Sequence, residues 1–93
     1  MNSSLVSIIT PSFNSAKFIA ETIQSVQNQT YQNWEMIIVD DGSSDETEMV
    51  ILSIIQNDNR IQFHKLNQNS GPAVARNTGI EKASGDYMTF IDA

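Results

Sequence analysis

The fold of this 93-residue chain follows from one stretch, Met36-Ile37-Ile38-Val39-Asp40-Asp41-Gly42-Ser43-Ser44-Asp45-Glu46. Four apolar residues, three of them β-branched, lead directly into two adjacent carboxylates and a glycine. A short β-branched run bounded by a turn signal predicts a strand that is buried on both faces. Asp40 and Asp41 are therefore expected at the carboxyl end of a central parallel strand, which is where open α/β sheets bind their ligands.

The residues after this strand predict a turn and then a helix. Gly42 ends the strand, and Ser43 with Glu46 has the Ser-x-x-Glu spacing of a capping box that opens a helix. Two adjacent like charges repel each other, so we expect at least one of the aspartates to contact a ligand. The alternative is that Asp41 or Ser43 only caps the following helix.

Strand-like and helix-like segments alternate along the whole chain. Strands are expected at residues 5–10, 34–40, 61–64 and 87–91, and helices at about 16–28, 45–55 and 72–84. The strand at 61–64 alternates apolar and polar residues, which places it nearer an edge of the sheet. We expect Pro11 to end the first strand, because a prolyl nitrogen cannot continue a central ladder. Gly79 inside the third helix predicts a close packing contact.

This order of elements predicts the fold class. Strands that alternate with helices form a parallel sheet with right-handed crossovers and helices on its faces. We therefore expect an α/β fold, a Rossmann-like three-layer β-α-β-α-β-α-β arrangement around a mostly parallel four-stranded sheet.

The composition of the chain excludes several classes of protein. The net charge is −6, from 5 basic and 11 acidic residues, which argues against binding nucleic acid or an anionic membrane through a basic face. The absence of cysteine excludes disulfides and thiolate chemistry. No apolar stretch approaches the roughly 20 residues of a membrane-spanning helix. We expect a cytoplasmic domain with no membrane segment in this chain.

The loops after the predicted strands should open on one edge of the sheet. Asp40, Asp41 and Asp92 would meet there, and Arg76 can lean back toward the same edge from the start of the third helix. Carboxylates together with a guanidinium favour a phosphorylated ligand that is held through a divalent cation. For Arg76 the alternative is a surface ion pair with Asp86.

Several other kinds of site do not fit the sequence. The first strand is followed by Pro11-Ser12-Phe13-Asn14 rather than by Gly-x-Gly-x-x-Gly, and there is no Walker-type phosphate loop. His64 is the single histidine, and without cysteine it cannot form a zinc site. A receiver-like signalling domain would carry its acidic pair after the first strand, whereas here the pair follows the second. Phe13 is the aromatic residue expected at the ligand edge, where it could flank a base.

Five segments, in order, resemble the glycosyltransferases of family 2 and together span nearly the whole chain. They are 6–14 (VSIITPSFN), 25–31 (SVQNQTY), 38–45 (IVDDGSSD), 69–79 (NSGPAVARNTG) and 85–93 (GDYMTFIDA). The resemblance implies a GT-A fold that binds a nucleotide-diphospho-sugar, often a UDP-sugar, and transfers the sugar with inversion.

The same resemblance implies roles for particular residues. The implied nucleotide-sugar contacts are Pro11, Ser12, Phe13 and Asp41 at the base, with Asp40 beside them, Arg76 at the diphosphate and Asp92 near the ribose. Asp92 would also be the first aspartate of an Asp-x-Asp motif and a ligand to Mn²⁺ or Mg²⁺. No catalytic residue is implied within the chain.

The resemblance further implies that residues 1–93 are the amino-terminal, nucleotide-sugar-binding part of a longer domain, cut within the Asp-x-Asp motif. The second aspartate, the acceptor-binding half and the catalytic base would follow Ala93, so the fragment should keep part of the donor pocket without turnover. The implied acceptor is a glycan or a lipid-linked acceptor in polysaccharide or glycoconjugate synthesis, with membrane association only through downstream parts.

Two further expectations concern the fragment itself. Apolar surface that is left uncovered would favour self-association. The alternative to a glycosyltransferase is a non-catalytic nucleotide-binding module.

Overall fold

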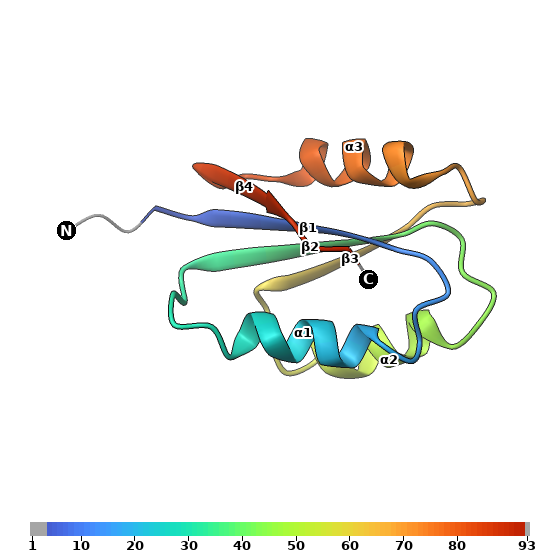
Figure 1. The fold of residues 1–93 in the computed structure, drawn as a ribbon, viewed down its shortest axis with the longest axis horizontal. Helices are drawn as coiled ribbons and strands as arrows, with labels where there is room; N and C mark the ends of the chain where they lie inside the picture. The colour runs from blue at the N-terminus through green and yellow to red at the C-terminus, as the bar shows by residue number, and fades with distance from the viewer. Residues whose placement is uncertain (1–3, 93) are drawn as a thin grey trace.

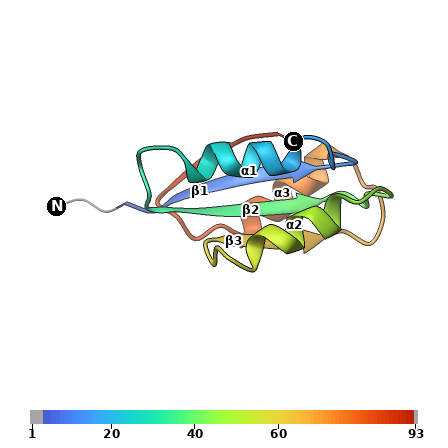
Figure 2. The ribbon, with the colours of Figure 1, turned by 90° about the horizontal axis from the view of Figure 1, so that it is seen from below.

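A four-stranded parallel sheet lies between helices on its two faces (Figure 1, Figure 2). The computed structural model describes residues 4–92. The elements in chain order are β1 (Val6–Ser12), α1 (Ile19–Gln27), β2 (Trp34–Asp40), α2 (Thr47–Ile55), β3 (Ile61–Lys65), α3 (Pro72–Lys82) and β4 (Tyr87–Phe90). Helix α3 covers one face of the sheet, and α1 and α2 cover the other (Figure 1). The predicted α/β fold with its three layers is confirmed.

The order of the strands places β1 and β2 in the middle of the sheet. The order is β3-β2-β1-β4, and every pairing is parallel. β3 lies at an edge, as its alternating residues predict. In the register of the sheet, Asp40 at the end of β2 lies beside Ser12 of β1 and Lys65 of β3. These strands finish at the same level, so the loops that follow them emerge at one end of the molecule (Figure 1).

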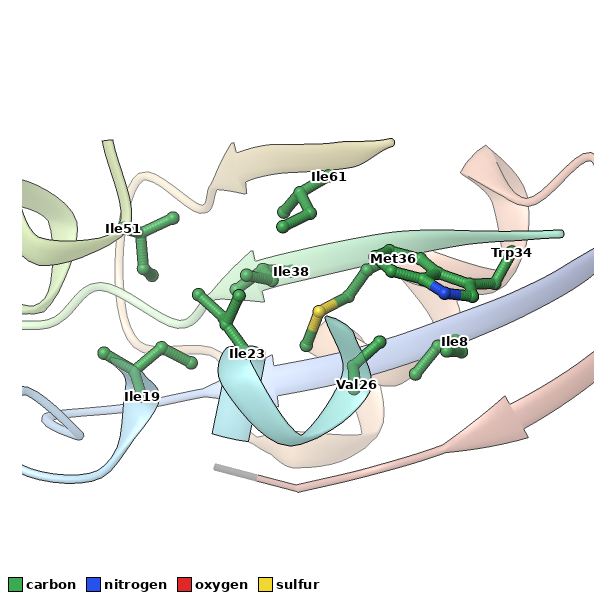
Figure 3. Packing of buried hydrophobic residues seen from close by; sticks show 9 residues of the cluster. All are labelled: Ile8, Ile19, Ile23, Val26, Trp34, Met36, Ile38, Ile51 and Ile61. Atoms are coloured by element: carbon green, nitrogen blue, oxygen red, sulfur yellow. The ribbon is translucent and has the colours of Figure 1, made fainter. Parts of the chain in front are cut away.

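The larger hydrophobic core lies between the sheet and the helices α1 and α2 (Figure 3). Its buried side chains are Ile8, Ile19, Ile23, Val26, Trp34, Met36, Ile38, Ile51 and Ile61. Ile37 and Val39 belong to a second cluster, in which they pack with Ala75 of α3. β2 is thus buried on both faces, as its apolar run predicts. Complete burial of one such aliphatic side chain contributes about 1.5–3 kcal/mol to folding.

Gly79 allows α3 to lie directly on β1. A Cβ atom at this position would come within 2.5 Å of the Cγ2 atom of Ile9, whose side chain is fully buried. The predicted close packing contact is confirmed. Because it sets the distance of α3 from the sheet, it also helps to place the start of α3 near the strand ends.

Pro11 does not end β1, which continues through Ser12. The carbonyl of Ile9 accepts the N–H of Ile91, so Ile9 directs its backbone groups away from β2. Pro11 lies two residues further along the strand, so its backbone faces the same side as that of Ile9. The last residue pair between β1 and β4 is Ile9 with Phe90, and Pro11 lies beyond it. No ladder bond is needed there, so the missing N–H costs little. The prediction that Pro11 ends the strand is wrong for this reason.

The helices begin or end slightly inside their predicted limits. α1 begins at Ile19 because the carbonyl of Ser15 first accepts the N–H groups of Phe18 and Ile19 in a turn. α3 begins at Pro72 as predicted but ends at Lys82. Gly85, expected as a helix stop, instead allows close approach to β1, since its Cβ would lie 2.9 Å from the backbone nitrogen of Ser7.

Candidate functional site

A pocket of about 270 Å³ lies at the carboxyl edge of the sheet. Its walls come from the end of β1, the residue after β2, the loop between β3 and α3, the first turns of α3 and the residues after β4. The lining residues are Pro11, Ser12, Phe13, Asp41, Asn69, Gly71, Pro72, Ala75 and Asp92. The structure therefore brings together loops that are far apart in the sequence, at the edge where parallel α/β sheets bind ligands.

Asp41 links two parts of the pocket lining, the end of β1 and the loop before α3. Its side chain is almost fully buried, and its carboxylate accepts the N–H of Ser70 at 2.7 Å and the N–H of Gly71 at 3.0 Å. Its own N–H donates to the carbonyl of Ser12 at 2.8 Å. Hydrogen bonds to an ionised acceptor are stronger than neutral ones. Asp41 therefore fixes the loop before α3 against the ends of β1 and β2.

Gly42 makes room for the same loop. Its φ is +76°, and a Cβ atom there would lie 2.9 Å from the backbone nitrogen of Asn69 and 3.0 Å from the carbonyl carbon of Gln68. The left-handed backbone favours glycine, and the close approach requires it. A side chain at residue 42 would displace this loop, which carries Asn69 of the pocket lining.

Asp40 is fully buried and is not one of the lining residues of the pocket. Its carboxylate accepts the Ser43 N–H at 2.9 Å and the Ser43 Oγ–H at 2.5 Å.

The predicted capping box is therefore wrong, because the buried carboxylate binds Ser43 before the helix begins. α2 starts at Thr47, its N-cap residue Glu46 makes no side-chain cap, and Asp45 accepts the Thr47 N–H at 3.0 Å.

Arg76 and Asp92 occupy different positions relative to the pocket. Asp92 is exposed and lines it. Arg76 is half-buried on α3 and is not a lining residue. Within residues 4–92 no ion pair joins Arg76 to Asp86, whose carboxylate instead accepts the N–H of Leu5 at 2.9 Å. The structure therefore does not show the surface pair considered for Arg76.

Sequence reasoning named five of the lining residues and missed four. The five are Pro11, Ser12, Phe13, Asp41 and Asp92, and the four are Asn69, Gly71, Pro72 and Ala75. The missed residues lie in the polar loop and helix start that the strand pattern places on this edge, and that position is the signal that could have found them.

The described residues supply only some of the ligands that the divalent cation expected at this edge would need. No group of three or more His, Cys, Asp or Glu side chains in residues 4–92 could hold a metal ion. Both carboxylate oxygens of Asp41 already accept backbone N–H groups. Asp92 is the remaining carboxylate of the pocket lining.

A parallel α/β sheet with a pocket at its carboxyl edge is typical of the ligand-binding α/β proteins. Comparison with known sequences identifies the family. Residues 7–93 match the family described as Glycosyl transferase family 2. The chain belongs to this family.

The chain is also similar to individual bacterial glycosyltransferases. It is 47% identical over 93 residues to an uncharacterized glycosyltransferase of Haemophilus influenzae, covering all of this chain and 37% of that protein. It is 47% identical over 89 residues to the putative teichuronic acid biosynthesis glycosyltransferase TuaG of Bacillus subtilis, covering 96% of this chain and 35% of TuaG. It is 43% identical over 93 residues to the UDP-Glc:alpha-D-GlcNAc-diphosphoundecaprenol beta-1,3-glucosyltransferase WfgD of Escherichia coli, covering 100% of this chain and 36% of WfgD.

Solved structures show the same fold. S. aureus TarS 1–349 in complex with UDP superimposes with a TM-score of 0.85 at 33% identity, covering 94% of this chain and 26% of that one. The mannosyltransferase PcManGT of Pyrobaculum calidifontis, in complex with GDP-Man and Mn²⁺, gives a TM-score of 0.88 at 25% identity, covering 94% of this chain and 26% of that one. The fold is that of the GT-A glycosyltransferases. Among residues 4–92, every helix is too short or too polar to cross a lipid bilayer.

Proposed function

We propose that this chain is the donor-binding part of a glycosyltransferase that transfers a sugar from a nucleotide-diphospho-sugar to an acceptor hydroxyl with inversion. The observation that carries the proposal is the pocket at the carboxyl edge, where Phe13, Asp41 and Asp92 line one cavity. A UDP-sugar is the favoured donor, because TarS is solved with UDP and with UDP-GlcNAc and the name of WfgD includes UDP-Glc.

The lining residues suit the parts of such a donor. Pro11 and Phe13 offer apolar surface for a base, and 47% of Phe13 is exposed. Each oxygen of Asp41 has a further lone pair with which to accept an imino N–H. The amino end of α3 lines the pocket at Gly71, Pro72 and Ala75, and the positive end of the helix dipole would favour an anionic group such as a diphosphate there. Arg76 would reach the diphosphate by extending back along α3.

We also propose that Mn²⁺ or Mg²⁺ accompanies the donor. Hard cations of this kind are commonly held by one or two carboxylates together with substrate phosphates, so Asp92 would supply one oxygen and the diphosphate others. When bound, the cation would offset the negative charge of the diphosphate beside the carboxylates. PcManGT is solved with Mn²⁺, which supports this proposal.

We do not assign a catalytic base to these 93 residues. The chain spans 37% and 35% of the lengths of the relatives from Haemophilus influenzae and Bacillus subtilis. We propose that residues 1–93 bind the donor but do not transfer its sugar, and that the activating base lies elsewhere in the full-length enzyme. An assay of donor transfer and hydrolysis tests this, and clear manganese-dependent turnover by the fragment would contradict it.

Donor binding itself can be tested by calorimetry with UDP, with and without Mn²⁺. Asp41→Ala should weaken UDP binding, because it removes an acceptor in the pocket and loosens the loop at Ser70 and Gly71. Glu81→Ala is the matched control, since it removes the same charge from an exposed position of α3 outside the pocket. Equal affinity of both variants would contradict the proposed site. Tighter binding of GDP than of UDP would contradict the choice of base.

The names of two relatives indicate the kind of acceptor. The name of WfgD and the name of the Campylobacter jejuni relative, a GalNAc(5)-diNAcBac-PP-undecaprenol beta-1,3-glucosyltransferase, both include an undecaprenol acceptor. We propose a glycan or lipid-linked acceptor in polysaccharide or glycoconjugate synthesis, used on the cytoplasmic side of a membrane. Binding of UDP without transfer by the full-length protein would instead favour the non-catalytic nucleotide-binding module.

A further inference from the structure

We propose that Asn14 is a positioning residue for donor binding, because it fixes the direction in which the neighbouring Phe13 faces the pocket. The proposal rests on the proposed function, in which Phe13 flanks the base. Asn14 itself is not a lining residue of the pocket, so its effect would be exerted through Phe13.

The first observation is the backbone conformation of Asn14. Its φ is +47°, and no other residue except glycine has a positive φ within residues 4–92. Asparagine adopts this left-handed conformation more readily than most residues with a side chain. The conformation turns the chain immediately after Phe13, between the end of β1 and the start of α1.

The second observation is that two hydrogen bonds hold this turn to the neighbouring loop. The N–H of Asn14 donates to Ser43 Oγ at 2.8 Å, and its side-chain Oδ1 accepts the N–H of Ser44 at 2.9 Å. Ser43 Oγ donates in turn to the buried carboxylate of Asp40 at 2.5 Å. The loop after β1 is therefore bonded to the loop after β2 through a group that is itself fixed at the strand end.

The third observation is that Phe13 lies outside both hydrophobic clusters. Its side chain is 47% exposed, and neither hydrophobic cluster of residues 4–92 includes it. The direction of its Cα–Cβ bond is set by the backbone on either side. β1 fixes the preceding residue, Ser12, and the bonds of Asn14 fix the following one.

Three substitutions separate the contributions of Asn14. Asn14→Asp keeps an acceptor oxygen and the tendency toward a left-handed backbone. Asn14→Gly keeps the backbone conformation but loses the acceptor, and Asn14→Ala loses both. Ile51→Val is the stability control, because it shortens a buried side chain of α2 without altering the loop.

Calorimetry of the 93-residue chain with UDP and Mn²⁺ gives the first readout. Relative to the wild type, we expect Asn14→Ala to raise the Kd about tenfold, Asn14→Gly to raise it less, and Asn14→Asp to stay within about twofold. Ile51→Val should lower the midpoint of urea unfolding and leave the Kd unchanged. An Asn14→Ala Kd equal to that of the wild type would overturn the proposal. A Kd of Ile51→Val that rises as much as that of Asn14→Ala would also overturn it.

A second readout does not require nucleotide binding. The heteronuclear NOE of the Phe13 and Asn14 amides reports motion on the ps–ns timescale. We expect rigid values in the wild type and in Asn14→Asp, and lower values in Asn14→Ala while the strand amides stay unchanged. If the wild type binds no UDP, the proposed function fails. Equal NOE values in the wild type and in all variants would overturn the role of Asn14, whether or not UDP binds.

Discussion

Asp40 and Asp41 are neighbours in the sequence, but their carboxylates bond to different loops. Asp40 is bonded to Ser43 in the loop after β2, whereas Asp41 is bonded to the N–H groups of Ser70 and Gly71 before α3. Successive side chains at a strand end point to opposite faces, so each acid meets its own donors. Two adjacent carboxylates are tolerated because each accepts hydrogen bonds from its own donors.

Replacement of Gly79 by alanine should destabilise the protein, although alanine is the better helix former. The added Cβ would meet the Cγ2 atom of Ile9 at 2.5 Å, and a buried β-branched side chain has little freedom to move. We expect the free energy of unfolding to fall by about 1–3 kcal/mol through overpacking. Urea denaturation of Gly79→Ala beside the wild type measures this change.

The control for this prediction is the same substitution in an Ile9→Ala background. That background removes the atom that the new Cβ would meet. Gly79→Ala should then stabilise the protein by up to about 1 kcal/mol through helix propensity. A Gly79→Ala single variant as stable as the wild type would contradict the packing of α3 on β1.

At the scale of the elements, the sequence predicts what depends on short-range pattern. The apolar run predicts the buried strand β2, the proline predicts the start of α3, and the glycine within α3 predicts a close contact. The structure agrees with all three predictions. The end of β1 could not be predicted, because whether Pro11 interrupts a ladder depends on which neighbour its backbone faces. The capping box was wrong because Asp40 binds Ser43, a contact that the Ser-x-x-Glu spacing does not reveal.

The same distinction applies to the candidate site. Asp41 and Asp92 could be placed at the pocket because they follow strands that end at one edge. The positions of Asn14 and Asn69 near this edge follow from the loops in which they lie, but their roles could not be predicted, because these depend on contacts with loops that are distant in the sequence, at Ser43 and at Gly42. An asparagine in a polar loop carries no such signal by itself.

The turn between α2 and β3 is held by Arg60. Its guanidinium lies 3.8 Å from the centroid of the Trp34 ring. Its Nε and Nη2 donate to the two carboxylate oxygens of Asp58 at 3.0 Å and 2.9 Å. The bonds from Arg60, together with a hydrogen bond from Gln27, lower the pKa of Asp58 to about 2. This cluster ties the start of β3 to the start of β2.

Asp58→Asn should therefore remove part of the pH dependence of stability. The pKa of the Asp58 carboxyl is 3.8 in a free chain and about 2 in the folded protein, so its contribution is complete above the higher value and lost as the pH falls toward the lower. Between about pH 5 and about pH 2, the wild type should lose about 1–2 kcal/mol more than Asp58→Asn. Urea unfolding across this range measures the difference, and parallel curves for the two proteins would contradict it.

At the scale of the whole molecule, β4 is the least covered part of the sheet. All four of its residues are exposed, including Tyr87 at 62%, Met88 at 48% and Phe90 at 45%. β4 also forms an edge of the sheet. An exposed apolar edge strand favours pairing with another chain.

We therefore predict that the 93-residue chain self-associates in solution. Light scattering over a range of concentrations should show an average mass that rises above that of the monomer. Met88→Lys should reduce the association, because a charged side chain on an edge strand opposes pairing, and it should leave UDP binding unchanged. A monomer at every concentration would count against the prediction.

The central claim is that the carboxyl edge of this sheet binds the nucleotide of a sugar donor. An NMR titration of the ¹⁵N-labelled chain with UDP and Mg²⁺ tests it most directly, because it reports where the ligand binds. We predict shifts in the amides of Phe13, Ser70, Gly71 and Asp92, with none at Arg60, which lies at the opposite end of the strands. No shift at saturating UDP, or shifts confined to the Arg60 end of the sheet, would contradict the claim.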